Sequence, residues 1–70
     1  MLDTTTRKIG HYRFGYGFLR AYHGQTQIGS TATQDAATRR EWLDRMAVEC
    51  SRRENDGARV SHGFGGFYRD

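Results

Sequence analysis

Three histidines and one cysteine are the side chains of this sequence best suited to bind a metal ion or attack a substrate: His11, His23, His62 and Cys50. No two of them have the short spacing typical of zinc sites, such as Cys-x-x-Cys. Cys50 falls on the apolar face of a predicted helix, where a thiol is usually inert. The carboxylates lie mostly on the other face of that helix, so no desolvated pair is available for acid–base catalysis. We therefore expect no enzymatic activity, no metal site and no cofactor.

A row of aromatic residues is the next feature able to do chemistry. The segment YRFGYGFLRAYHG, residues 12–24, has a ring or an arginine at every second position, namely Tyr12, Phe14, Tyr16, Phe18, Arg20 and Tyr22. Alternation with a period of two is typical of a strand, because successive side chains point to opposite faces. A face made of rings either forms a core beneath a helix or is a platform for nucleotide bases or a partner protein.

The strands that carry these rings are predicted from the same alternation. Residues 9–22 and 25–32 are expected to form two strands joined at His23-Gly24, a two-residue loop suited to a hairpin. This register places Leu19 opposite Ile28 and leaves a glycine-rich face behind the rings. Residues 58–64 predict a third strand that Gly65-Gly66 interrupts. A right-handed crossover would place it beside the first strand and antiparallel to it.

The segment of residues 30–55 is the predicted helix. Thr31 or Thr33 can cap its N-terminus, Asp35 adds a favourable charge in the first turn, and Gly57 suits the turn after its end. A period of 3.6 residues places one set of side chains on the core face: Ala36, Leu43, Met46, Ala47 and Cys50, with Trp42 beside them.

These elements predict an α+β fold: a small three-stranded, antiparallel-type sheet in ββαβ order, with one amphipathic helix packed on one face. Residues 1–8 are expected to be a loose N-terminal segment and residues 9–70 a single domain. The helix is expected to cover the rings and to leave the glycine-rich face open. The small size and Val48 on the polar face of the helix are compatible with a homodimer.

The location of the protein follows from two absences in the sequence. One cysteine allows no internal disulfide. No apolar run follows the first residues, so we expect neither a signal peptide nor a membrane span. We therefore expect a cytoplasmic protein.

The net charge of +3 is unevenly distributed. Residues 1–34 hold the entire excess of positive charge, whereas residues 35–70 are balanced, so attraction to phosphate or to an acidic surface should begin in the N-terminal half. The candidate partner-binding residues combine these cations with the tyrosines of the row: Arg7, Lys8, Tyr12, Arg13, Tyr16, Arg20 and Tyr22.

Two stretches resemble small phage-encoded anti-CRISPR proteins of the type I-F group. They are the Ile28-Gly29 pair with Trp42 thirteen residues after it, and the helix end SRREN at residues 51–55. Those inhibitors are single small domains without enzymatic activity that cover the crRNA-guided surveillance complex and keep target DNA out. The resemblance implies a phage or mobile-element inhibitor that acts in the cytoplasm of a bacterial host, where its partner is a host protein or ribonucleoprotein complex.

An alternative resemblance covers residues 12–46. A hairpin followed by a helix, with the sequence HGQTQIGSTATQDAATRREWLDRM, is similar to the arm-type DNA-binding domains of tyrosine recombinases, in which a small sheet enters the major groove. This implies a DNA- or RNA-binding module that uses the basic and aromatic residues of the hairpin. Few cations are present, whereas strong duplex binding takes about six to ten phosphate contacts, and this favours the inhibitor interpretation.

Overall fold

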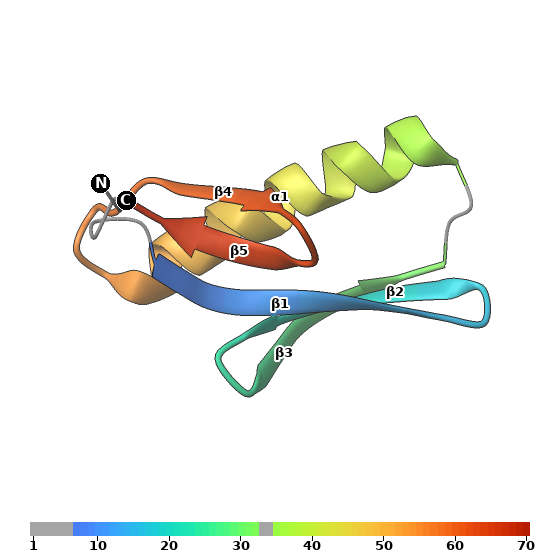
Figure 1. Ribbon diagram of the computed structural model, residues 1–70, viewed down its shortest axis with the longest axis horizontal. Helices are drawn as coiled ribbons and strands as arrows, with labels where there is room; N and C mark the ends of the chain where they lie inside the picture. Colours follow the sequence, from blue (N-terminus) through green and yellow to red (C-terminus); the bar gives the residue numbers. More distant parts are fainter. Residues whose placement is uncertain (1–6, 33–34) are drawn as a thin grey trace.

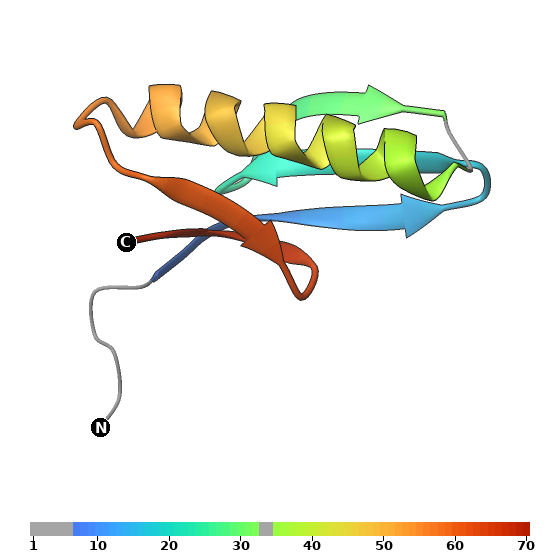
Figure 2. The same cartoon turned by 90° about the horizontal axis from the view of Figure 1, so that it is seen from above.

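The computed structural model describes residues 7–32 and 35–70, which form an antiparallel sheet and one helix (Figure 1). The elements are β1 (Arg7–Gly15), β2 (Phe18–His23), β3 (Thr26–Thr31), α1 (Ala36–Glu54), β4 (Val60–Gly63) and β5 (Gly66–Arg69). The five strands are ordered β3-β2-β1-β5-β4, so β1 is central. The single helix α1 lies across one face of the sheet (Figure 2).

The prediction of an α+β fold with an antiparallel sheet and one helix is confirmed, but the prediction of three strands in ββαβ order is wrong. Each long strand segment turns back on itself, at Tyr16-Gly17 and at Phe64-Gly65, which gives five strands. Gly17 and Gly65 have φ of +73° and +75°, a conformation that glycine adopts without a Cβ clash. β1 begins at Arg7, two residues before the boundary expected from the sequence.

The two-residue turn after β1 decides which side chains face the helix. The register of β1 with β2 pairs Tyr12 with Ala21, so even positions of β1 share a face with odd positions of β2. Tyr12 and Phe14 therefore lie on the side of α1, whereas Phe18 and Tyr22 lie on the opposite side. The prediction that the whole aromatic row lies beneath the helix is wrong, because it treated β1 and β2 as one uninterrupted strand.

The turn between β2 and β3 also differs from the prediction. The loop is Gly24-Gln25 rather than His23-Gly24, since His23 pairs with Thr26. Leu19 consequently lies opposite Thr31 and not opposite Ile28.

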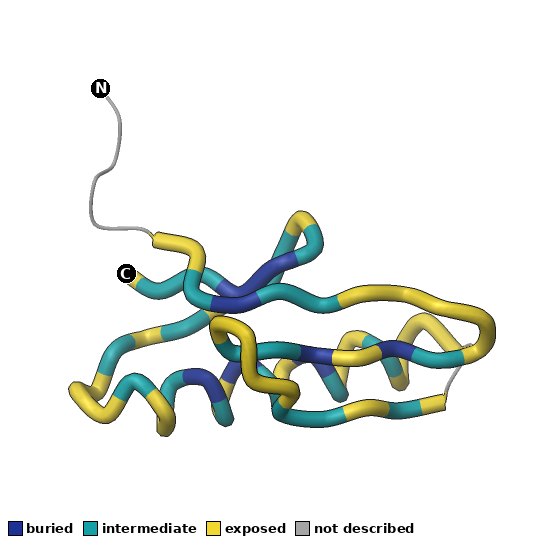
Figure 3. Tube along the Cα trace, turned by 90° about the horizontal axis from the view of Figure 1, so that it is seen from below, coloured by how far each residue is buried: buried dark blue, intermediate teal, exposed yellow. Residues whose placement is uncertain are grey.

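The core lies between α1 and the inner face of the sheet. Its buried side chains are Leu19, Ala21, Leu43, Ala47, Cys50 and Phe67. The predicted core face of the helix is thus confirmed for Leu43, Ala47 and Cys50, whereas Ala36 is exposed. Gly10 is needed at the centre of the sheet, because a Cβ there would lie 2.2 Å from the Tyr22 carbonyl oxygen. Figure 3 shows buried positions in β2, β5 and α1 and exposed ones at the β1–β2 turn.

The ends of α1 have side-chain and backbone caps. The Asp35 carboxylate accepts a 2.8 Å hydrogen bond from the backbone N–H of Thr38, so Asp35 is the N-cap. Thr31, one of the predicted caps, is the last residue of β3, and Thr33 lies outside the described residues. Asn55 ends the helix with φ of +63°. In the described ranges, no helix combines the length and the apolar character needed to cross a bilayer.

Candidate functional site

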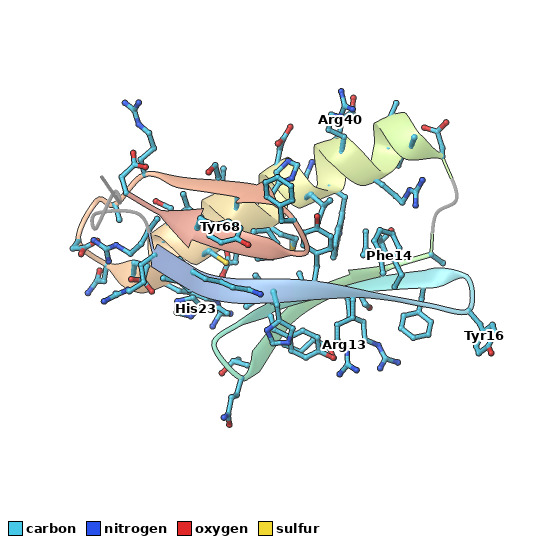
Figure 4. The ribbon with its side chains drawn as sticks, viewed as in Figure 1. Arg13, Phe14, Tyr16, His23, Arg40 and Tyr68 are labelled. Carbon is cyan, nitrogen blue, oxygen red and sulfur yellow. The ribbon has the colours of Figure 1, made fainter. Side chains whose placement is uncertain are left out.

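The face of the sheet that points away from α1 gathers aromatic and cationic side chains. We call it the outer face, and its side chains are Lys8, His11, Arg13, Phe18, Arg20, Tyr22 and Tyr68. Cross-strand partners share a face of a sheet, which places these seven together. Figure 4 shows Arg13 pointing away from the helix, while its neighbour Phe14 lies on the helix side.

Two ring arrangements organise the outer face. His11 and Tyr22 are cross-strand partners whose rings stack with centroids 4.6 Å apart and planes only 13° apart. The Arg20 guanidinium lies 4.3 Å from the centroid of the Phe18 ring. The tip of that ring lies over Gly15, where a Cβ would lie 2.0 Å from a Phe18 ring carbon. Glycine at this position therefore leaves room for the Phe18 ring.

Arg13 and Arg20 are direct cross-strand partners on the outer face. Like charges placed directly opposite each other destabilise a sheet. In the part of the chain that the structure describes, neither guanidinium forms an ion pair with a carboxylate. Both arginines line a hollow of about 260 Å³ together with Phe18, Tyr22 and, at its edge toward the helix side, Phe14. This arrangement favours an anion between the two guanidinium groups.

Positive and negative charges lie on different elements. None of the five strands contains an aspartate or a glutamate. The carboxylates of residues 7–32 and 35–70 belong to α1, to its flanking segments or to the last residue: Asp35, Glu41, Asp44, Glu49, Glu54, Asp56 and Asp70. The outer face is therefore cationic although the second half of the chain is neutral overall.

The seven predicted partner-binding residues divide into two groups. Lys8, Arg13, Arg20 and Tyr22 come together on the outer face. The other three lie elsewhere, and they are Arg7, Tyr12 and Tyr16. Arg7 is 4.0 Å from the Glu54 carboxylate on the helix side. The Tyr12 hydroxyl faces inward and accepts a 3.2 Å hydrogen bond from the backbone N–H of Gly65. Tyr16 is fully exposed at the tip of the β1–β2 hairpin (Figure 4).

Sequence reasoning did not select His11, Phe18 and Tyr68 for the site. The β1–β2 turn places His11 and Phe18 on the same face, and the regular alternation of aromatic residues gives no sign of this turn. A signal was present for that turn, since Tyr16-Gly17 places a glycine between two strand-like runs. Tyr68 reaches the outer face because β5 pairs with β1 and places it opposite Lys8.

The histidines considered as metal ligands have separate roles in the structure. His23 lies 2.6 Å from a Glu54 oxygen, and His62 lies 2.7 Å from an Asp44 oxygen, so each ties the sheet to the helix. His11 stacks on Tyr22 instead. Over residues 7–32 and 35–70, no group of three or more potential ligands is placed to hold a metal ion.

The chain matches no protein-family model, no curated protein and no solved structure. The resemblances to anti-CRISPR proteins and to arm-type domains stay predictions.

Proposed function

We propose that the outer face binds a short segment of single-stranded nucleic acid. The observation that carries this proposal is the direct opposition of Arg13 and Arg20 on a face whose strands contain no carboxylate. The Arg20 guanidinium gains a contact with the Phe18 ring, but its position opposite Arg13 adds repulsion between like charges, which a phosphate bound between them would remove. The protein thus forgoes some stability to concentrate positive charge there.

The rings of the outer face favour nucleic acid over a simple anion. Base–aromatic stacking contributes about 1–3 kcal/mol per base and tolerates any sequence, because every base has a π-face. Along the hairpin, the His11–Tyr22 stack lies on one side of the Arg13–Arg20 pair and Phe18 lies on the other. A single nucleic-acid strand also presents bases and phosphates in alternation, so its bases can contact the rings while its phosphates contact the cations.

The small number of cations favours a single strand over a duplex. The outer face has three side chains that are positively charged at neutral pH, namely Lys8, Arg13 and Arg20. Strong duplex binding usually neutralises about six to ten phosphates, and stacking on protein rings requires unpaired bases. A bound segment would thus be a few nucleotides long.

Fluorescence polarisation with labelled ten-nucleotide RNA and DNA oligonucleotides tests the proposal. For three neutralised phosphates on a single strand, the slope of log K against log salt concentration should be about −2. Arg13→Glu should weaken binding at least about tenfold while raising Tm, because it creates an attractive pair with Arg20 in place of a repulsive one. Tighter binding to duplex than to single strands would contradict the proposal.

Arg40→Glu is the matched control, because it makes the same charge change on the helix side of the molecule (Figure 4). It should change affinity much less than Arg13→Glu. Equal losses would mean that net charge alone attracts the oligonucleotide.

Inhibition of a CRISPR surveillance complex, as the resemblance implies, has a distinct outcome. The protein would then copurify with that complex and block its target DNA binding while having no affinity for free oligonucleotides. That result would replace the present proposal.

A further inference from the structure

The turn between β4 and β5 carries an unexpected residue. Gly63 pairs with Gly66, so Phe64 and Gly65 form a two-residue hairpin loop with φ of +47° and +75°. Positive φ at both positions is typical of a type I′ turn, whose preferred sequence is Asn-Gly. A bulky residue such as phenylalanine strains this backbone conformation. Asparagine at position 64 would make the hairpin more stable than phenylalanine does.

The Phe64 side chain does not compensate for this strain by packing in the core. It is 99% exposed, so its ring contributes almost no apolar burial to folding. A strained backbone and an exposed ring at one position are expected where function, and not stability, selects the residue.

The ring borders a hollow that continues onto the outer face. This hollow has a volume of about 400 Å³ and is lined by Ser61, His62, Gly63, Phe64 and Tyr68. Its size falls within the range of small-molecule sites, roughly 300–1,000 Å³. Tyr68 belongs to both surfaces, because it lies in the hollow and is the cross-strand partner of Lys8. The Lys8 side chain passes over Gly66, where a Cβ would lie 2.6 Å from its Cε atom.

We infer that this hollow receives one unpaired nucleobase of the strand bound to the outer face, stacked on the exposed Phe64 ring. Tyr68 also lines the hollow, and Lys8 neutralises the adjoining phosphate. The inference rests on the proposed function and extends it to a second element, the β4–β5 hairpin. A planar base suits the site because two rings line it and a cation stands at its border.

The decisive variant is Phe64→Asn, measured with the same oligonucleotides. It should weaken binding about tenfold or more, because a stacked base is lost. It should also raise Tm, because Asn-Gly is favoured in a type I′ turn. The salt slope should stay the same, since no phosphate contact is removed. Phe64→Trp should retain wild-type affinity, which separates a stacking ring from a merely structural turn residue.

A direct readout comes from an oligonucleotide with 2-aminopurine at successive positions. One position should be quenched on binding to the wild type and should recover in Phe64→Asn. An abasic site at that position should weaken wild-type binding and leave Phe64→Asn unaffected.

The two proposals fail in different ways. If Arg13→Glu abolishes binding and Phe64→Asn binds like the wild type, the inference about the hollow is wrong and the proposed function stands. If the wild type binds no oligonucleotide, both are wrong.

Discussion

Arg69 at the end of β5 donates a 2.6 Å hydrogen bond to the carboxylate of Glu54, the last residue of α1. His23 of β2 contacts the other oxygen of the same carboxylate at 2.6 Å. Glu54 thereby joins the end of the helix to two strands that lie on opposite sides of β1. These polar contacts hold the C-terminal end of α1 on the sheet. Apolar packing of Leu43, Ala47 and Cys50 holds the earlier part of the helix there.

The hydrogen bonds from His23 and Arg69 hold the pKa of Glu54 below its ordinary value of 4.5. A carboxyl group with a lower pKa in the folded state binds fewer protons there than in the unfolded state. Its stabilising effect is therefore complete above pH 4.5 and is lost as the pH falls through the folded-state pKa. We expect thermal melts to show Tm decreasing below that pH, with a weaker decrease in Glu54→Gln.

Glu49→Gln is the control for the Glu54 prediction. Glu49 pairs with Arg52 and Arg53 of the same helix, through exposed contacts. Such pairs contribute little, so this variant should follow the wild-type acid profile. A parallel acid profile for Glu54→Gln and the wild type would contradict the role given to Glu54.

Leu43 should carry a large share of the core energy. Leu43 is only 7% exposed and lies in the core between α1 and the sheet. Leu43→Ala should therefore lower the free energy of unfolding, measured in urea, by about 2–5 kcal/mol. Leu43→Asp should leave it unfolded, because it places an unpaired charge in the core. Val48→Ala is the matched change on the same helix, and its side chain is 61% exposed. It should alter stability by no more than about 0.5 kcal/mol.

Cys50 should report on unfolding through its thiol. Its side chain is fully buried, and burial raises the pKa of the thiol to about 11. Near neutral pH, the native protein should therefore react with Ellman's reagent only as fast as it opens. Urea should make the reaction fast. Rapid labelling of the native protein at neutral pH would contradict the packing of α1 on the sheet.

Tyr12 should support the hairpin that carries Phe64. Its hydroxyl accepts a hydrogen bond from Gly65, and its ring contacts Phe67 edge-on with centroids 5.7 Å apart. Tyr12→Phe keeps the ring but removes the acceptor, so we expect a loss of about 0.5–1.5 kcal/mol. Tyr16→Phe removes a hydroxyl from an exposed tip and should leave stability unchanged. Similar losses in both variants would show that the Gly65 contact does not contribute.

Local signals in the sequence predicted the helix and its core face, but not its start, since residues 30 and 31 of the predicted segment belong to β3 and α1 begins at Ala36. The 3.6-residue period placed Leu43, Ala47 and Cys50 on one face, and the structure buries all three. The capping residue was less predictable, because several polar residues precede the helix and any of them can accept the first backbone N–H groups. Thr31 is excluded from that role because it belongs to β3, and Asp35 is the cap that the structure shows.

The candidate site was predictable in its residue types and only partly in its members. Lys8, Arg13, Arg20 and Tyr22 were predicted and are together on the outer face. Tyr12 was predicted as well, but it faces the core. The missed turn at Tyr16-Gly17 is the source of the other error, because it moves Phe18, Arg20 and Tyr22, which follow it, from the predicted helix side to the outer face.

The sequence by itself determined the kinds of element, the amphipathic face of α1 and the placement of excess positive charge in the first half of the chain. The tertiary structure alone decided how the aromatic row divides between core and surface. The reason is geometric, because a two-residue turn pairs even positions of one strand with odd positions of the next. Rings that alternate regularly along the chain therefore lie on opposite faces of the sheet, with Tyr12 and Phe14 on the helix side and Phe18 and Tyr22 on the outer face.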